Sequence, residues 1–162
     1  MSTVKNTVLA AALVMLPTMI LAQANPKPTT KPAAPAHPMA EMMTPDKLTW
    51  SPIQPEGFDP GLELAVVRGN PNATTGSYVA RLKLPNGYKF PAHWHPMTEN
   101  VTVLEGEFSL GMGSKPDDSK LMTYPTGSYL YLPAHNIHFG QVRGTTVLQL
   151  TGTAPFKIML AK

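Results

Sequence analysis

The heptapeptide HWHPMTE, residues 93–99, brings together three side chains that can bind a metal ion. In an extended strand successive side chains alternate between faces, so His93 and His95 should point the same way. Pro96 cannot continue a ladder in a central strand, so we expect the chain to turn there. Glu99 would then enter the next antiparallel strand close to both histidines. The alternative is an ordinary surface loop with three polar side chains.

A second segment that contains histidines is GSYLYLPAHNIHFG, residues 127–140. Its leucines alternate as core-facing residues, and Pro133 ends the strand. We expect only one of the two histidines that follow to bind an ion. His138 is the candidate, because it is the first strand residue after the turn, whereas His135 lies in the loop.

The segment from Asp46 onward predicts an all-β domain. Short runs rich in Val, Leu, Tyr and Thr alternate with turn residues, and no helical period lies between them. These runs are ELAVV, SYVARLKL, ENVTVLEGEFSLGM, GSYLYL, TTVLQL and FKIML. Many short strands at even spacing indicate a closed barrel or a two-sheet jelly roll.

The histidine-rich segment resembles the first motif of the cupins. That motif is a glycine, five residues, H-x-H, three or four residues, a glutamate, six residues and a glycine. Its fixed positions are filled here by Gly87, His93, His95, Glu99 and Gly106. The resemblance extends from about Leu62 to Leu150.

The second cupin motif is matched in part. Gly127, Pro133 and His138 stand at its fixed positions. His135 stands where the family has glycine, and could strain the turn or carry a proton near the ligands. Val142 stands where the family has asparagine, which affects no expected ligand.

The resemblance implies a single-domain cupin β-barrel, a double-stranded jelly roll, that holds one divalent metal. The implied ligands are His93, His95, Glu99 and His138. The segment LTWSPIQPEGFDPG, residues 48–61, is similar to an arm that precedes the barrel, and such arms often cross a partner subunit. A homodimer is therefore expected.

Three regions are predicted along the chain. Residues 1–24 combine a positive start, an apolar run and a small-x-small cleavage site, which is typical of a secretory signal peptide. Residues 25–45 form a Pro-rich linker that favours extended backbone. Residues 46–162 form the cupin domain. We therefore expect a periplasmic or secreted protein with no membrane segment after cleavage.

The charge and the cysteine content argue against nucleic-acid binding and exclude disulfides and thiolate metal sites. The formal net charge is +3, to which Lys5 of the signal peptide contributes, and the basic residues are scattered, which argues against nucleic-acid binding. The chain has no cysteine, so it has neither disulfides nor thiolate metal ligands. The expected partner is a small molecule.

Five further side chains were considered for a functional role. Tyr129 and Tyr131 alternate with core-facing leucines, so we expect them on the outer face, in an interface. Gln149 could face the pocket or the solvent. Phe58 is expected to pack within the arm, like Trp50, rather than to contact a ligand.

Three neutral imidazoles and one carboxylate would leave about two positions open on a six-coordinate ion. This suits Fe, Mn, Ni or Co, whereas Zn prefers four ligands. We expect an oxygenase-type enzyme that acts on a small organic molecule, although no catalytic acid or base is identifiable beyond the ligands. The alternatives are a non-catalytic protein that binds a carboxylate or sugar-like ligand, and a metal-dependent lyase or isomerase.

Overall fold

The computed structural model describes residues 40–162 as nine strands and two short 3₁₀ helices. The strands are β1 (Ser51–Ile53), β2 (Leu62–Arg68), β3 (Ser77–Leu84), β4 (Lys89–Trp94), β5 (Glu99–Met112), β6 (Met122–Pro125), β7 (Tyr129–Leu132), β8 (His138–Thr153) and β9 (Met159–Leu160). The helices are η1 (Pro45–Lys47) and η2 (Asp118–Lys120). The predicted signal peptide and most of the predicted linker lie outside the described residues.

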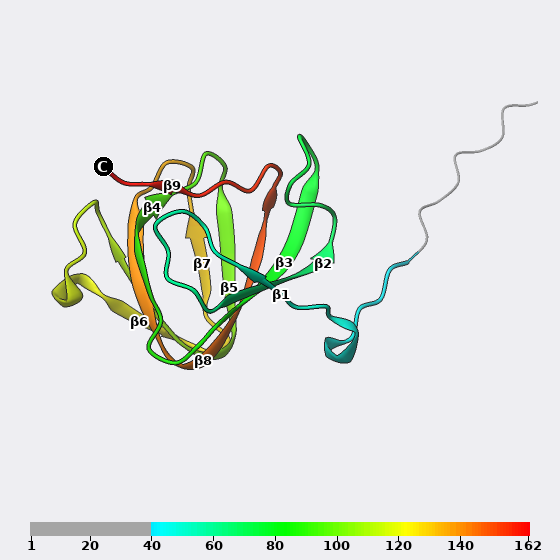
Figure 1. The fold of residues 1–162 in the computed structure, drawn as a ribbon, viewed down its shortest axis with the longest axis horizontal. Coiled ribbons are helices and arrows are strands. Elements are labelled where there is room, and N and C mark those ends of the chain that lie inside the picture. Colours follow the sequence, from blue (N-terminus) through cyan, green and yellow to red (C-terminus); the bar gives the residue numbers. More distant parts are fainter. Residues whose placement is uncertain (1–39) are drawn as a thin grey trace, which may run out of the picture. The chain divides into compact units, whose positions relative to one another are not determined.

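The strands of residues 40–162 form one curled antiparallel sheet, which confirms the predicted β-barrel (Figure 1). The order β1-β2-β3-β8-β4-β9 forms one path through it, and β5 pairs with β6, β7 and β8. Figure 1 shows the long strand β8 (orange to red) bending around one end of the barrel. Among the described residues, no helix has the length and hydrophobicity of a membrane span.

Strands β5 and β8 form the longest ladder, and a bulge at Gly106 bends it. The register shifts between Val103 and Glu105 and again between Glu105 and Glu107, the interval that contains Gly106, whose φ is +76°. A Cβ atom at Gly106 would meet the Thr146 side chain and the carbonyl oxygen of Thr145. Only glycine therefore fits this bulge, which lets the ladder curl instead of remaining flat.

Strand β8 pairs with both strands that supply the other candidate ligands, and its register brings the ligands close together. Its first residue, His138, lies directly opposite His93 of β4. Near its other end, Gly152 lies opposite Glu99, the first residue of β5. Glu99 begins the next strand and lies close to His95, as expected from the sequence. Strands β4 and β5 are not paired with each other, however, and it is β8, paired with both, that brings the ligands together.

The barrel interior follows the alternation expected from the sequence. On β7, Leu130 and Leu132 are buried, whereas Tyr129 and Tyr131 are 62% and 61% exposed. Trp50 lies outside the barrel, where the Lys83 ammonium is 4.5 Å from the centroid of its ring. The interpretation of Trp50 as a packing residue of the arm therefore agrees with its position.

Candidate metal centre

Three histidines from two separated segments meet inside the barrel. One ring nitrogen of each of His93, His95 and His138 lies within 4.8 Å of those of the other two. Because His93 and His138 are cross-strand neighbours, their ring centroids are only 4.3 Å apart. The ring of His95, one residue beyond the end of β4, lies 5.1 Å from that of His93 and 5.4 Å from that of His138. These histidines form a possible metal site.

Backbone carbonyls set the tautomer of all three rings. The Nδ1 atoms of His93 and His138 lie 2.7 Å and 3.0 Å from the carbonyl oxygens two residues before them in the chain. His95 Nδ1 lies 2.8 Å from the carbonyl oxygen of Lys157. A carbonyl oxygen can only accept, so each Nδ1 must donate a hydrogen, which leaves the Nε2 lone pair of the neutral ring free to bind an ion.

The imidazoles are also held neutral. Burial, the nearby His138 and, less strongly, His95 lower the pKa of His93 to about 3, although the carbonyl of Pro91 opposes this. Burial likewise lowers the pKa values of His95 and His138. Neutral imidazole is the form that binds metals, so the three rings need lose no proton near neutral pH.

Glu99 is buried beside this group. One carboxyl oxygen lies 3.4 Å from His95 Nε2, and the residue is 6% exposed. Burial raises the pKa of Glu99 to about 7, although the nearby His138 opposes this. Since burial also lowers the pKa of His95, the two groups do not form a charged pair in the absence of an ion. A divalent cation would favour the ionised carboxylate.

The donor set therefore fits a divalent transition metal. Three imidazole nitrogens and a carboxylate oxygen match the ligand preferences of Fe, Mn, Ni, Co and Zn. The carbonyl partner of each ring is the arrangement that orients histidines in protein metal sites.

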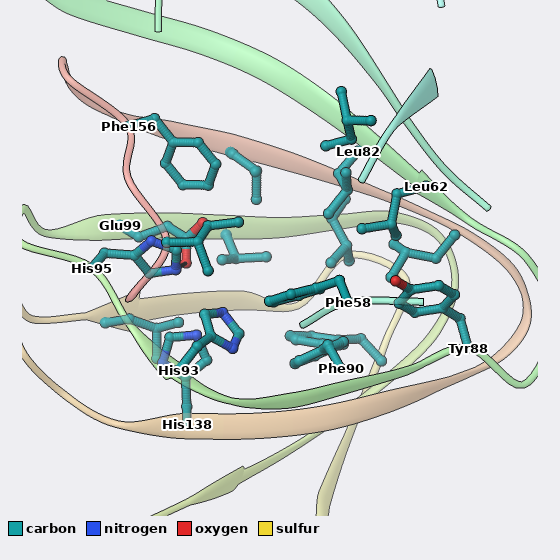
Figure 2. A pocket seen from close by; sticks show the side chains of 18 residues that line it. Phe58, Leu62, Leu82, Tyr88, Phe90, His93, His95, Glu99, His138 and Phe156 are labelled. Carbon is teal, nitrogen blue, oxygen red and sulfur yellow. Dashed lines mark ion pairs between the residues drawn. The ribbon is translucent and has the colours of Figure 1, made fainter. Parts of the chain in front are cut away.

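The histidines open onto an apolar cavity of about 60 Å³. Most of its walls are aliphatic or aromatic side chains. Figure 2 shows the three imidazoles and Glu99 grouped at one end, with Phe58 and Phe90 between them and Tyr88. Such walls exclude water and strengthen electrostatic interactions at the polar end.

An aromatic collar around the imidazoles was missed by the sequence interpretation. Phe58 and Phe90 meet His93 edge-on, with ring centroids 5.2 Å and 5.7 Å away. Phe156 stacks on His95 at 5.0 Å. Phe58 was expected to be a packing residue of the arm rather than a ligand contact. It does pack in the hydrophobic core, but its ring also lines the cavity beside the histidines, which the sequence did not indicate. The only sequence signal was that Phe58 is an apolar residue between Gly57 and Asp59. The residues around it do not indicate that its ring packs against a histidine.

The other candidate residues lie away from the cavity. His135 is exposed, with φ +66°, and its ring packs 4.9 Å from that of Trp94 on the outside. Gln149, left open by the sequence, accepts a hydrogen bond from Arg81 and alternates with the cavity-lining Leu148 and Leu150. It therefore lies on the outer face.

Comparisons with solved structures show the same fold. The polyketide cyclase RemF from Streptomyces resistomycificus has a TM-score of 0.62 and 16% identity, with 76% of this chain and 87% of that chain covered. A cupin-2 domain protein from Rhodospirillum rubrum has a TM-score of 0.57 and 13% identity, over 80% and 85% of the two chains. An RmlC-like cupin from Shewanella frigidimarina has a TM-score of 0.54 and 16% identity, over 71% and 91%.

A comparison with curated proteins gave no match. The family model of the ChrR cupin-like domain matches residues 38–157, which include the barrel strands β1–β8 and all four candidate ligands. The resemblance to cupins stated from the two motifs is thereby confirmed. The chain belongs to the ChrR cupin-like family of the cupins.

Proposed function

We propose that this protein is a metal-dependent enzyme of the oxygenase type that acts on a small organic molecule. The observation that carries the proposal is the set of three carbonyl-oriented imidazoles beside Glu99, facing an apolar cavity. Structural metal sites are closed by protein ligands, whereas sites that act on substrates border a space that a substrate can occupy.

In this proposal His93, His95, Glu99 and His138 hold one divalent transition metal. When bound, the metal would act as a Lewis acid on a substrate oxygen and support dioxygen chemistry. The carbonyl oxygens of Pro91, Asn136 and Lys157 keep the rings in place. The aromatic and aliphatic walls bind the apolar part of the substrate and exclude water.

Structures of similar fold include enzymes, by their names a polyketide cyclase and a DMSP lyase, with TM-scores of 0.62 and 0.51. Their identities to this chain are 16% and 14%, so the likeness extends to the fold alone. We take from them only that this barrel accommodates reactions of small molecules.

A second candidate function is binding without turnover. Besides the four candidate ligands, the only ionisable side chain in the cavity wall is Tyr88, within the described residues. Its hydroxyl already donates to the carbonyl oxygen of Asp59, at 2.6 Å. With no separate acid or base, a protein that anchors a carboxylate or sugar-like ligand, or a lyase or isomerase that needs no dioxygen, is also compatible with this site.

The decisive measurements are metal content and dioxygen uptake. Protein purified without chelators should contain about one transition metal ion per chain by elemental analysis. With the native metal and a panel of small enols, diketones and aromatics, we expect dioxygen uptake above that of the metal-free protein. Uptake at background for every metal and substrate would exclude the oxygenase. Turnover under anaerobic conditions would instead indicate a lyase or isomerase, and no turnover in either condition a binding protein.

We also propose that the protein is exported and pairs with itself. Cleavage of residues 1–24 would leave Asn25 as the first residue, which mass spectrometry of the protein from cell fractions can test. The exposed Tyr129 and Tyr131 would lie in the dimer interface. Analytical ultracentrifugation should then show a dimer that Tyr131→Ser weakens, and a wild-type monomer at high concentration would contradict this.

A further inference from the structure

The connection between β1 and β2, Gln54–Gly61, separates two hollows of the barrel. Phe58 lines the cavity that contains the histidines. Gly57 and Asp59, its two neighbours, line a groove of about 300 Å³ instead. Phe90 of β4 borders both spaces. The side chains of Phe58 and Phe90 therefore stand between the groove and the imidazoles.

The cavity beside the histidines is small for a substrate. Its volume of about 60 Å³ accommodates a few water molecules, since each needs roughly 10–15 Å³ on this measure. A cavity that binds benzene in another protein has roughly 150 Å³. A molecule with a ring therefore reaches the histidines only if a wall residue moves. Figure 2 shows that Phe58 occupies the centre of this space, next to His93.

The connection is attached to the barrel by few hydrogen bonds. Two of its bonds are internal: the Phe58 N–H donates to Pro55, and the Gln54 amide donates to the carbonyl oxygen of Phe58 at 3.4 Å. Among residues 40–162, its only hydrogen bond to another part of the chain is the one that the Tyr88 hydroxyl donates to Asp59. Segments with so few bonds open locally at a lower free energy than paired strands.

Gly57 provides a point about which the connection can turn. Its φ is +77°, and a Cβ atom there would lie 2.6 Å from Leu160 Cδ1. Glycine permits both the left-handed backbone and this close approach to the C-terminal segment. Because glycine has access to more backbone conformations than any other residue, the position directly before Phe58 restricts the movement of the connection least.

We propose that Phe58 is the specificity-determining residue of the site and the gate of its cavity. Phe58 swings outward with the Gln54–Gly61 connection and admits, from the groove, a small molecule with one flat apolar group. That group then takes the place of the Phe58 ring against Phe90 and His93. The bond between Tyr88 and Asp59 is the latch of the closed state. This inference rests on the proposed function for the identity of what enters, but not for the movement itself.

The movement is tested on the metal-free protein by hydrogen–deuterium exchange. We expect the Phe58 amide to exchange at least 100-fold faster than the amides of β5 and β8. Tyr88→Phe, which retains the ring and removes the hydrogen bond to Asp59, should raise the exchange rate of the Phe58 amide about fivefold above that of wild type. Tyr124→Phe, which removes a hydroxyl hydrogen-bonded only to Met122 among the described residues, is the matched control and should not change the exchange of the Phe58 amide. Exchange as slow as that of the barrel strands would overturn the gate.

Selectivity is tested with cobalt(II)-loaded protein and two probes, imidazole and 4-phenylimidazole, by stopped-flow absorbance. We expect wild type to take up 4-phenylimidazole at least 10-fold more slowly than imidazole. Phe58→Leu should reduce this ratio and Phe58→Ala should abolish it. Tyr124→Phe, outside the cavity wall, is the control and should leave the ratio at that of wild type. Equal ratios in wild type and both Phe58 variants would refute the selectivity.

A failure of the proposed function and a failure of the proposed gate give different results. If wild type binds no cobalt(II) or any other transition metal, the proposed function fails, while hydrogen exchange still decides on the gate. If the metal binds but neither exchange nor probe uptake responds to Tyr88→Phe and the Phe58 variants, the gate fails and the metal centre remains.

Discussion

The histidine side and the Phe58 side of the cavity are held in place in different ways. His93 and His138 lie on paired strands, and the Nδ1 atom of each ring donates to a backbone carbonyl. Phe58 lies on a connection that, within residues 40–162, a single side-chain hydrogen bond attaches to the rest of the barrel. Groups that must keep a fixed geometry are thus placed on rigid elements, and the residue that we propose to move is placed where few bonds must break.

The largest expected effect is on the histidine side. His93→Ala should weaken transition-metal binding about 300-fold, because each of four ligands supplies roughly 2.5–4 kcal/mol of a typical binding free energy and about 1.4 kcal/mol corresponds to a factor of ten. The barrel should remain folded, since its core consists of apolar residues elsewhere. Competition with a chelator gives the affinity and circular dichroism the fold. His135→Ala, which removes an exposed histidine, is the control and should bind as wild type does.

Phenylalanine truncations compare the two sides directly. Phe108→Ala on β5 should lower the free energy of unfolding by about 3–5 kcal/mol, because paired strands cannot close around the lost ring. Both rings border the cavity, but Phe58→Ala should cost about half as much, because its connection has few hydrogen bonds and can relax into the space that the ring leaves. Urea denaturation of the metal-free protein measures both. Equal losses would indicate that the Phe58 connection is as firmly packed as the barrel.

Metal binding to the histidine side should release the proton of Glu99, so the metal affinity should depend on pH. The metal-bound form needs the Glu99 carboxylate, but in the free protein burial raises the pKa of Glu99 to about 7. Metal affinity should therefore fall about tenfold for each pH unit from 7 to 5. Above pH 7 it should level off, since His93, with a pKa of about 3, is already neutral. Titration calorimetry in two buffers gives the proton count, and Glu99→Gln should remove the slope.

The smallest expected effect concerns the turn that leads to His138. His135 adopts φ +66°, a conformation that costs a non-glycine residue about 1 kcal/mol. His135→Gly relieves this strain but loses the contact with Trp94 and makes the unfolded chain more flexible. We expect a net stabilisation of about 0.5 kcal/mol, measured by urea denaturation. A loss above 1 kcal/mol would show that the contact with Trp94 outweighs the strain.

Much of the histidine side could be predicted because local rules determine it. Alternation along a strand places His93 and His95 on one face, and the start of a strand after a turn distinguishes His138 from His135. The structure brings these three histidines together. The role of Lys157 could not be predicted, because its carbonyl reaches His95 from 62 residues away along the chain. Any residue type supplies such a carbonyl, so no side-chain pattern marks it.

The sequence by itself determined the all-β class, the candidate ligands and the two motifs, since these depend on residue type and on short-range periodicity. The tertiary structure alone decided that β8, rather than direct pairing of β4 with β5, joins the ligands. It also decided that Phe58 turns inward to His93. The physical reason is that strand register and the path of a connection depend on packing between distant segments, which residue spacing within one segment does not specify.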